Sequence, residues 1–218
     1  FTAFNAGGLT GPVRISSKSA SVAADLEPEY VAVSADSTTA YIMLQENNAV
    51  ATLDLATKTI TGIRGLGFKD YSIPGNEMDP SNEDGGVNIR SVPVFGVYMP
   101  DSADTYTFNG ITYIVTANEG DGREYLTDAE DTEDCAEQGG FDFDDGDCFH
   151  YLDEIRIKDI TDDGATFDKD LVALAGDDFE ANEKLGRLTV ITNLGASGTC
   201  ASLATTGQPG ADCTYKAL

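Results

Sequence analysis

The chain has 218 residues, and its 38 acidic side chains against 13 basic ones give a net charge of -25 at pH 7. With 41% hydrophobic residues it is able to bury a core, which excludes wholesale disorder. So few Lys and Arg residues exclude nucleic acid as the main ligand and exclude insertion into an anionic bilayer. No stretch approaches the roughly 18 consecutive apolar residues that span a membrane.

Residues 30–60 predict an antiparallel meander. Turn-forming residues separate three runs that are rich in β-formers, 31–34, 40–44 and 49–55, and a fourth run at 59–63 follows the turn at 54–58. These four runs together predict one four-stranded sheet.

A second unit with the same layout begins near Val92. It continues through a hairpin at Asn109-Gly110, because Asn-Gly between apolar runs is a strong hairpin signal. Repeated four-stranded sheets predict an all-β fold built from β-propeller blades, with a β-sandwich as the alternative. We expect blade-like units at about 25–65 and 90–125, an acidic insertion at about 126–150 and further strands over 151–218.

The length is small for a propeller. At roughly 40 to 45 residues a blade, the chain makes about three or four blades, which is fewer than a closed ring needs. We therefore expect an incomplete ring with open sheet edges, completed by the remainder of the same propeller or by another protein chain.

Residues 121–180 carry 22 acidic and 4 basic side chains, so they account for most of the negative charge. The run from Asp128 to Asp147 is almost all acid and Gly and predicts an exposed insertion loop. After it we expect strands at 153–160 and 185–195, a hairpin turn at 162–164 and a turn or two of helix at 177–184.

The four cysteines fall into two local pairs with equal spacing. Cys135 and Cys148 are thirteen positions apart, and so are Cys200 and Cys213. This spacing favours two disulfides that close these loops, although four cysteines allow three connectivities. A zinc site is the alternative, but no pair has the short Cys-to-Cys spacing that is typical of one. Disulfides indicate the periplasm, the cell surface or the extracellular medium.

Three oxygen-rich segments are candidate metal sites, each with an ordinary turn or solvated loop as the alternative. Calcium prefers carboxylate and amide oxygens, about 6 to 8 of them. The segments are residues 45–48, with Glu46 and Asn47; residues 79–86, with Asp79 and Asp84; and residues 118–124, with Asn118, Glu119, Asp121 and Arg123. In the third, Glu119 and Asp121 lie on one side of an extended chain, where Arg123 either neutralises them or binds an anion.

A fourth candidate is the acidic run itself. Its carboxylates repel one another, and divalent cations relieve such repulsion, so weak binding of several ions is the functional interpretation. A solvating acidic loop is the alternative. The candidate residues are Asp142, Asp144, Asp145 and Asp147.

His150 is the only histidine, and no Gly-x-Ser-x-Gly motif lies near it. A serine hydrolase triad would need this residue as its base, so we do not expect one here.

Several long strings resemble the choice-of-anchor I domain family, which includes bacterial proteins labelled alkaline phosphatase-like and mesenchyme-specific cell-surface glycoproteins. The resemblance runs from about Asp25 to Tyr125 and resumes weakly from Glu154 to Lys216, and it implies a secreted or surface-attached β-propeller. Its family members continue beyond the last residues of this chain, and no glycosylation sequon is present here. The strings are LEPEYVAVSADSTTAYIMLQENNAVATLDL, LGFKDYS, MDPSNEDGGVNI and VFGVYMPDSADTYTFNGITYIVTANEGDGREY.

The sequence therefore predicts an extracellular, calcium-binding β-propeller segment that acts as a surface or matrix interaction module. Two alternatives stay open. One is a metal-dependent phosphoesterase in which calcium or another divalent metal polarises phosphate and Arg123 holds it. The other is a structural subunit of an extracellular assembly, joined through open sheet edges.

Overall fold

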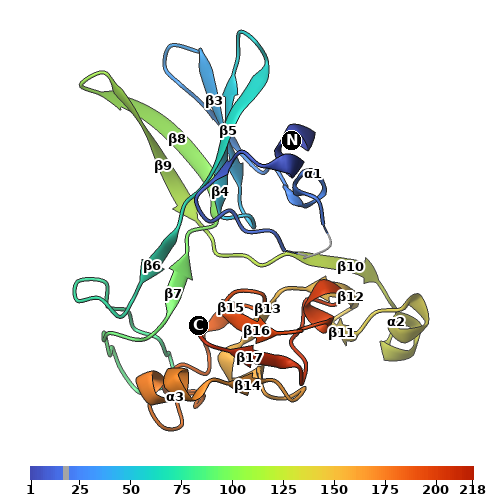
Figure 1. The fold of residues 1–218 in the computed structure, drawn as a ribbon. Helices are drawn as coiled ribbons and strands as arrows, with labels where there is room; N and C mark the ends of the chain where they lie inside the picture. Colours follow the sequence, from blue (N-terminus) through green and yellow to red (C-terminus); the bar gives the residue numbers. More distant parts are fainter. Residues whose placement is uncertain (17–19) are drawn as a thin grey trace. The chain divides into compact units, whose positions relative to one another are not determined.

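The computed structural model describes residues 1–16 and 20–218, which form two compact units. Unit 1 comprises residues 1–69 and 97–121, and unit 2 comprises residues 70–96 and 122–218. Both consist mainly of β-strands with a few short helices (Figure 1), so the all-β prediction is confirmed at that level. The strand pairing of the described residues shows no closed barrel and no propeller.

Unit 1 contains a five-stranded sheet in the order β1-β5-β4-β3-β2 and a hairpin of β8 and β9. Strands β2 to β5 pair antiparallel in sequence order, which confirms the predicted meander. The short β1 adds to β5 in parallel, a pairing that the sequence did not predict. The elements are η1 (Thr2–Ala6), β1 (Leu9–Thr10), α1 (Val22–Asp25), β2 (Val31–Val33), β3 (Thr39–Leu44), β4 (Ala49–Asp54), β5 (Thr59–Gly65), β8 (Pro100–Phe108) and β9 (Ile111–Asn118).

Two aspartates hold the turns of the meander. Asp36 accepts hydrogen bonds from the Ser34 hydroxyl at 2.7 Å and from the Thr38 hydroxyl at 2.8 Å. Asp54 accepts them from the Thr57 backbone N–H at 2.7 Å and from its hydroxyl at 2.9 Å. These donors favour the ionised carboxylates, so they lower the pKa of both Asp36 and Asp54 below the usual value. The polar turns thus fix the register that buries Leu44 and Ile63 on one side of the sheet.

The β8–β9 hairpin forms at the predicted Asn109-Gly110 turn. Asn109 has φ of 50° and Gly110 has φ of 77°, as a type I′ turn requires. The four-stranded layout predicted for this region is not what the described residues show, because β8 and β9 pair with each other as a two-stranded sheet. Strand β7 (Phe95–Val97), which the sequence predicts to join them, pairs instead with β6 (Phe68–Asp70) as a separate two-stranded sheet.

Unit 2 contains two three-stranded sheets, β10-β12-β11 and β14-β17-β16, and the pair β13-β15. Its core gathers aliphatic side chains, among them Ile157, Ile160 and Leu171, around Tyr215. Its elements are β10 (Glu124–Asp128), α2 (Thr132–Gln138), β11 (Asp142–Asp144), β12 (Asp147–Leu152), β13 (Glu154–Arg156), η2 (Ile157–Asp159), β14 (Thr166–Phe167), α3 (Lys169–Ala175), β15 (Thr189–Ile191), β16 (Ala196–Gly198), η3 (Ser202–Ala204) and β17 (Cys213–Tyr215).

Both predicted disulfides are present, Cys135–Cys148 and Cys200–Cys213. Their Cα atoms are 5.2 Å and 4.8 Å apart, within the range that a disulfide requires. All four sulfur atoms are thereby used, so these cysteines do not form the alternative zinc site.

Other local predictions for unit 2 need correction. The turn that contains Gly164 does not make a hairpin with the preceding strand, because β14 after it pairs in parallel with β17. The expected helix at 177–184 is a series of turns. Helix α3 lies just before it, where Asp168 caps the helix by accepting a hydrogen bond from the Asp170 N–H at 2.9 Å.

Candidate functional site

The acidic segment is an ordered substructure rather than a loop. Strands β11 and β12 form a tight hairpin around Asp145 and Gly146, and β10 pairs with the other edge of β12. Asp145 has φ of 47° and Gly146 has φ of 99°, so both take the left-handed backbone that a two-residue hairpin turn requires. The Asp-Gly pair in FDFDDGDC therefore forms the two central residues of this turn.

Register places three aspartates in a row across this sheet. Asp147 on β12 lies opposite Asp128 on β10 and opposite Asp144 on β11. Directly paired residues share one face of a sheet, with Cβ atoms about 4.5–5.5 Å apart, and like charges in such positions destabilise it. Asp142 lies two residues before Asp144 and therefore on the same face. One face of the sheet thus concentrates four carboxylates.

Helix α2 covers the opposite face. The Cys135–Cys148 disulfide joins the helix to β12, and Cys148 is fully buried. Asp131 caps the helix by accepting hydrogen bonds from the N–H groups of Glu133 and Asp134, both at 2.9 Å. The acidic face is therefore held by a disulfide and a capped helix behind it. Residues 124–152 carry eleven Asp and Glu residues and no Lys or Arg.

His150 takes part in a structural chain of hydrogen bonds on the helix-covered face. The Gln138 amide donates to the Asp128 carbonyl at 3.1 Å, so its oxygen accepts from the Thr127 hydroxyl at 2.7 Å. That hydroxyl has then used its proton, and it accepts from Nε2–H of His150 at 2.9 Å. His150 is thus hydrogen-bonded within the acidic substructure.

The turn at residues 45–48 is buried inside unit 1. Asn47 is fully buried, and its amide donates to the Asp25 carboxylate at 2.8 Å and to the Arg14 carbonyl at 2.9 Å. Its oxygen accepts from the Glu27 N–H at 3.2 Å. The fold itself therefore occupies the amide of Asn47. Glu46 beside it is only 8% exposed.

Two of the predicted sites converge in unit 1. Gln45, at the end of β3, donates from Nε2 to the Glu119 carboxylate at 3.1 Å. Glu119 and Asp121 are exposed, and Asn118 accepts a hydrogen bond from the Thr116 hydroxyl at 2.9 Å. The structure thus brings the predicted ligands around residues 45 and 119 to one part of unit 1.

Arg123 lies in unit 2 and is anchored through its backbone. Its N–H donates to the Asp153 carboxylate at 2.8 Å, and its carbonyl accepts from the Asp153 N–H at 3.1 Å. The Arg123 side chain is buried, at 2% exposure. An anion that used this guanidinium would therefore have to enter the protein interior.

Asp79 and Asp84 meet at Asn88. The Asp79 carboxylate accepts from the Asn88 backbone N–H at 3.2 Å, and the Asp84 carboxylate accepts from the Asn88 side-chain amide at 2.9 Å. An isolated antiparallel bridge between Met78 and Arg90 closes the base of this segment. Both predicted metal ligands therefore accept hydrogen bonds from Asn88 within one loop.

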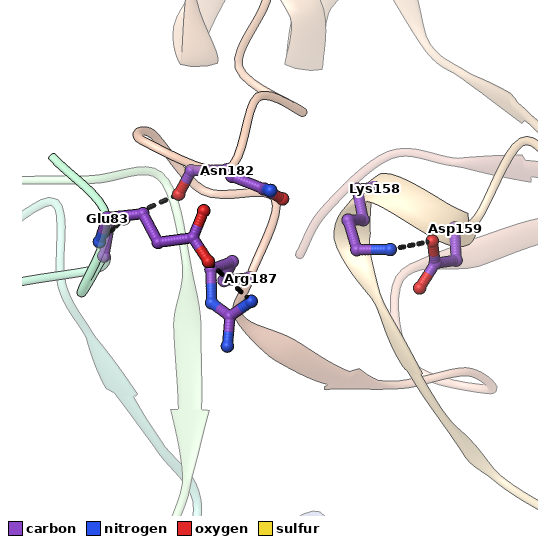
Figure 2. A network of polar contacts seen from close by, with 6 residues as sticks. Glu83, Lys158, Asp159, Asn182 and Arg187 are labelled. Carbon is purple, nitrogen blue, oxygen red and sulfur yellow. Dashed lines mark hydrogen bonds and ion pairs between the residues drawn. The ribbon is translucent and has the colours of Figure 1, made fainter.

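A shallow, open depression lies beside this loop. It has a volume of about 540 Å³ and is lined by Asp79, Pro80, Ser81, Asn82, Gly86 and Arg187. Arg187 forms an ion pair with Glu83 at 2.8 Å, as Figure 2 shows. The Ser81 hydroxyl donates to the Asn182 carbonyl at 2.6 Å. These contacts fasten the loop to the segment that follows α3.

The candidate carboxylates do not form a preorganised metal site. Among residues 1–16 and 20–218, no group of three or more His, Cys, Asp or Glu side chains is arranged to hold a metal ion. Sequence reasoning chose Asp142, Asp144, Asp145 and Asp147 as candidate cation ligands. It missed Asp128, which lies opposite Asp147 on the neighbouring strand. The Asp-Gly pair signals only part of the row, since a hairpin turn there aligns Asp144 with Asp147, whereas no local signal places Asp128 beside Asp147.

Comparison with known proteins gives the family. A family model described as choice-of-anchor I domain matches residues 2–207. The chain belongs to the choice-of-anchor I domain family. A search of curated proteins found no match, and neither did a search of solved structures. The choice-of-anchor I domain and its two disulfides are consistent with an extracellular or surface location. No described helix is both long and apolar enough to cross a membrane.

Proposed function

We propose that this choice-of-anchor I domain is an extracellular surface-interaction module whose acidic sheet binds calcium or a similar divalent cation. The observation that carries the proposal is the row formed by Asp128, Asp147 and Asp144 across three neighbouring strands. Such a row is costly without counter-charge, because like charges face one another across the sheet. A divalent cation between adjacent carboxylates replaces this repulsion with attraction.

The expected affinity is low. The carboxylates of the row are exposed or half-buried, and they stand on strands instead of wrapping around one point. Extracellular calcium modules bind with dissociation constants of about 10⁻⁴–10⁻³ M, and a site of this kind belongs in that class. Loosely held ions on an exposed acidic face are suited to bridging the protein to another anionic surface, which supports a role in surface or matrix interaction.

The other predicted metal ligands would form secondary calcium sites, apart from the aspartate row. Glu46, Glu119 and Asp121 belong to unit 1, whereas Asp79 and Asp84 belong to unit 2. We propose that calcium binds them more weakly than it binds the row, because internal hydrogen bonds already use part of the oxygens of Glu119, Asp79 and Asp84. The β2–β5 meander of unit 1 is the part of the chain that supports a propeller blade.

The test compares thermal unfolding in calcium and in chelator. Calcium at a hundred times its dissociation constant stabilises the folded state by about 2.7 kcal/mol, which raises the melting temperature. Asp147→Asn removes the central charge of the row, so it should melt higher than the native protein in chelator and gain less from calcium. Asp163→Asn makes the same charge change at an exposed turn outside the sheet and serves as the control.

Two results would overturn the proposal. One is a melting temperature that calcium leaves unchanged. The other is an equal calcium effect in Asp147→Asn and in the native protein, since it would show that the ions bind elsewhere.

A further inference from the structure

Strand β9 has a long outer edge that lacks the usual protection against pairing. It spans eight residues, Ile111–Asn118, and within the described residues it pairs only with β8. None of the eight side chains is charged, none is Pro, and most are β-branched or aromatic. Natural edge strands usually carry Lys, Pro or a bulge that blocks the addition of another strand. The outer edge of β9 has neither a charge nor a proline.

One face of the β8–β9 hairpin is apolar and exposed. Tyr106 lies opposite Tyr113 and Phe108 lies opposite Ile111. Val115 follows on the same side of β9, opposite Asp104, where the apolar strip ends. The two tyrosine rings stack with centroids 5.1 Å apart. Phe108 and Val115 are 61% and 57% exposed. The hairpin thus presents an apolar strip that an added strand would extend.

The other face of the hairpin is turned toward the sheet of unit 1. Strand β8 packs against β2 and β3, and the Thr105 hydroxyl donates to the Val33 carbonyl at 2.7 Å. Thr105 alternates with Tyr106, so it lies on the side opposite the apolar strip. The hairpin is therefore anchored on one face and on its β8 side, which leaves the apolar strip and the β9 edge accessible.

Charge divides the hairpin along its length. Asp101 and Asp104 lie in the half of β8 away from the turn, and Glu119 and Asp121 follow β9 at the same end. No Lys or Arg occurs in residues 97–121. The end at the Asn109-Gly110 turn is uncharged, and its strip face carries Phe108 and Ile111. A matching strand therefore needs positive charge at one end and apolar side chains at the other.

This polarity disfavours a second copy of the chain as the partner. Parallel pairing of two β9 strands would place Glu119 beside its own copy, which like charges oppose. Antiparallel pairing would place the acidic end of one copy against the uncharged turn of the other, with no charge match. The net charge of -25 adds repulsion between two copies at any register.

We propose that the outer edge of β9 accepts an extended strand from a different polypeptide, with alternating large apolar residues and Lys or Arg at the end beside Glu119. Main-chain hydrogen bonds supply affinity in this kind of strand addition, while the side chains set specificity. The apolar residues extend the strip of Tyr113 and Val115. This inference concerns unit 1 and does not depend on cation binding by the acidic sheet of unit 2.

The test uses synthetic eight-residue peptides that alternate Val and Thr and carry two Lys residues at one end. Binding to the full chain is followed by fluorescence anisotropy, in calcium and in chelator. A peptide with alternate backbone amides N-methylated has the same side chains but lacks half of its N–H donors. We expect the unmodified peptide to bind at least tenfold more tightly than the methylated one, and Glu in place of Lys to weaken binding comparably.

Substitution of Val115 locates the binding site. Val115→Lys places a charge beside the proposed strand and should reduce peptide affinity at least tenfold, while circular dichroism checks that the fold is kept. Val87→Lys makes the same change at a side chain that is 82% exposed in unit 2, and it should leave the affinity unchanged. Equal binding of the methylated peptide, no binding of any peptide, or self-association of the chain that Val115→Lys abolishes would each overturn the proposal.

Discussion

Gln45 donates a hydrogen bond from Nε2 to Oε2 of Glu119 at 3.1 Å, across 74 residues of sequence. The contact connects the β3–β4 turn with the chain that leaves β9. Glu119 also uses its backbone, since its N–H donates to the Met99 carbonyl at 3.2 Å. Glu119 thus ties the β8–β9 hairpin to the sheet of unit 1, whether or not it also binds an ion.

Replacement of Glu119 separates its charge from its hydrogen bond. Glu119→Ala removes the acceptor for Gln45 and should lower the free energy of unfolding by about 1 kcal/mol. Glu119→Gln is the matched variant, because its amide oxygen still accepts from Gln45 while the charge is lost. We expect its loss in urea unfolding to be less than half that of Glu119→Ala. Equal losses in the two variants would show that the charge, and not this hydrogen bond, stabilises the fold.

Asn48 is a structural residue that sequence reasoning placed in a ligand-binding turn. It has φ of 48° and is 1% exposed. Its side-chain oxygen accepts from the backbone N–H groups of Tyr98 and Met99 at 3.1 and 3.2 Å, and its amide donates to the Gly67 carbonyl at 2.8 Å. Asn48→Ala leaves the buried Met99 N–H without its partner, so we expect a loss of about 3 kcal/mol in the free energy of unfolding.

A glycine at the same position isolates the backbone contribution. Asn48→Gly loses the same hydrogen bonds but adopts the left-handed backbone without strain. Urea unfolding should therefore show Asn48→Gly to be more stable than Asn48→Ala by about 1 kcal/mol. Two variants of equal stability would mean that the positive φ costs nothing here.

The acidic hairpin depends on its turn. Gly146 has φ of 99°, which residues with a Cβ adopt at a cost, although nothing lies within 4 Å of a Cβ placed there. Gly146→Ala should therefore destabilise unit 2 by about 1 kcal/mol or more through backbone strain alone. Gly86→Ala is the control, since Gly86 has equally open surroundings without a positive φ in that range. A melting temperature that falls equally in both variants would contradict this account.

Local sequence signals predicted the parts of the fold whose turns they specify. The four strands of the meander and the Asn109-Gly110 hairpin followed from turn residues and alternation, and the cysteine pairs followed from spacing. The same rule applied to Asp145-Gly146 would have given the acidic hairpin, but the density of carboxylates suggested a calcium loop instead. The segment forms a hairpin there, because Asp145 and Gly146 both adopt the positive φ that a two-residue hairpin turn requires.

Pairings between distant segments were not predictable in this way. Strand β14 joins β17 in parallel, with Thr166 opposite Thr214, and no turn between neighbours specifies such a contact. Asp25 is another case, because it sits in the short helix α1 yet accepts hydrogen bonds from the Ser16 N–H at 3.0 Å and from the Asn47 amide at 2.8 Å. Composition marks Asp25 as one more acidic residue, and only the packing of unit 1 makes it a buried acceptor.

The two disulfides offer a comparison at constant loop length. Cys135–Cys148 and Cys200–Cys213 each have a sequence separation of 13. In the chain-entropy model each therefore stabilises by about 3 kcal/mol, and removal of either pair as a double Ser variant should cost the same amount. Urea unfolding of the two double variants tests this. A difference above about 1 kcal/mol would show that native packing around the sulfurs contributes besides loop closure.

Burial raises the pKa of the Tyr215 phenol, which is 1% exposed and donates to the Thr192 carbonyl at 2.6 Å. Tyr215→Phe keeps the ring in the core of unit 2 but leaves that carbonyl without the hydroxyl. We expect the variant to lose about 1 kcal/mol of stability in urea unfolding. Tyr106→Phe removes a hydroxyl from an exposed ring of the hairpin and should change stability little. The two losses being equal would contradict the importance of the buried hydrogen bond.

Asp36 gives the protein a pH-dependent turn. Donors from Ser34 and Thr38 lower its pKa below the ordinary 3.8, so the folded state favours the ionised form more than the unfolded chain does. This contribution to stability is therefore complete above the ordinary value and is lost as the pH falls through the lowered pKa. Asp36→Asn should be less stable than the native protein at pH 7, with the difference in urea midpoint shrinking below about pH 4. The comparison with the variant is needed because protonation also relieves the repulsion among the other carboxylates. A difference that persists unchanged at pH 2 would mean that Asp36 acts through its shape and not through its charge.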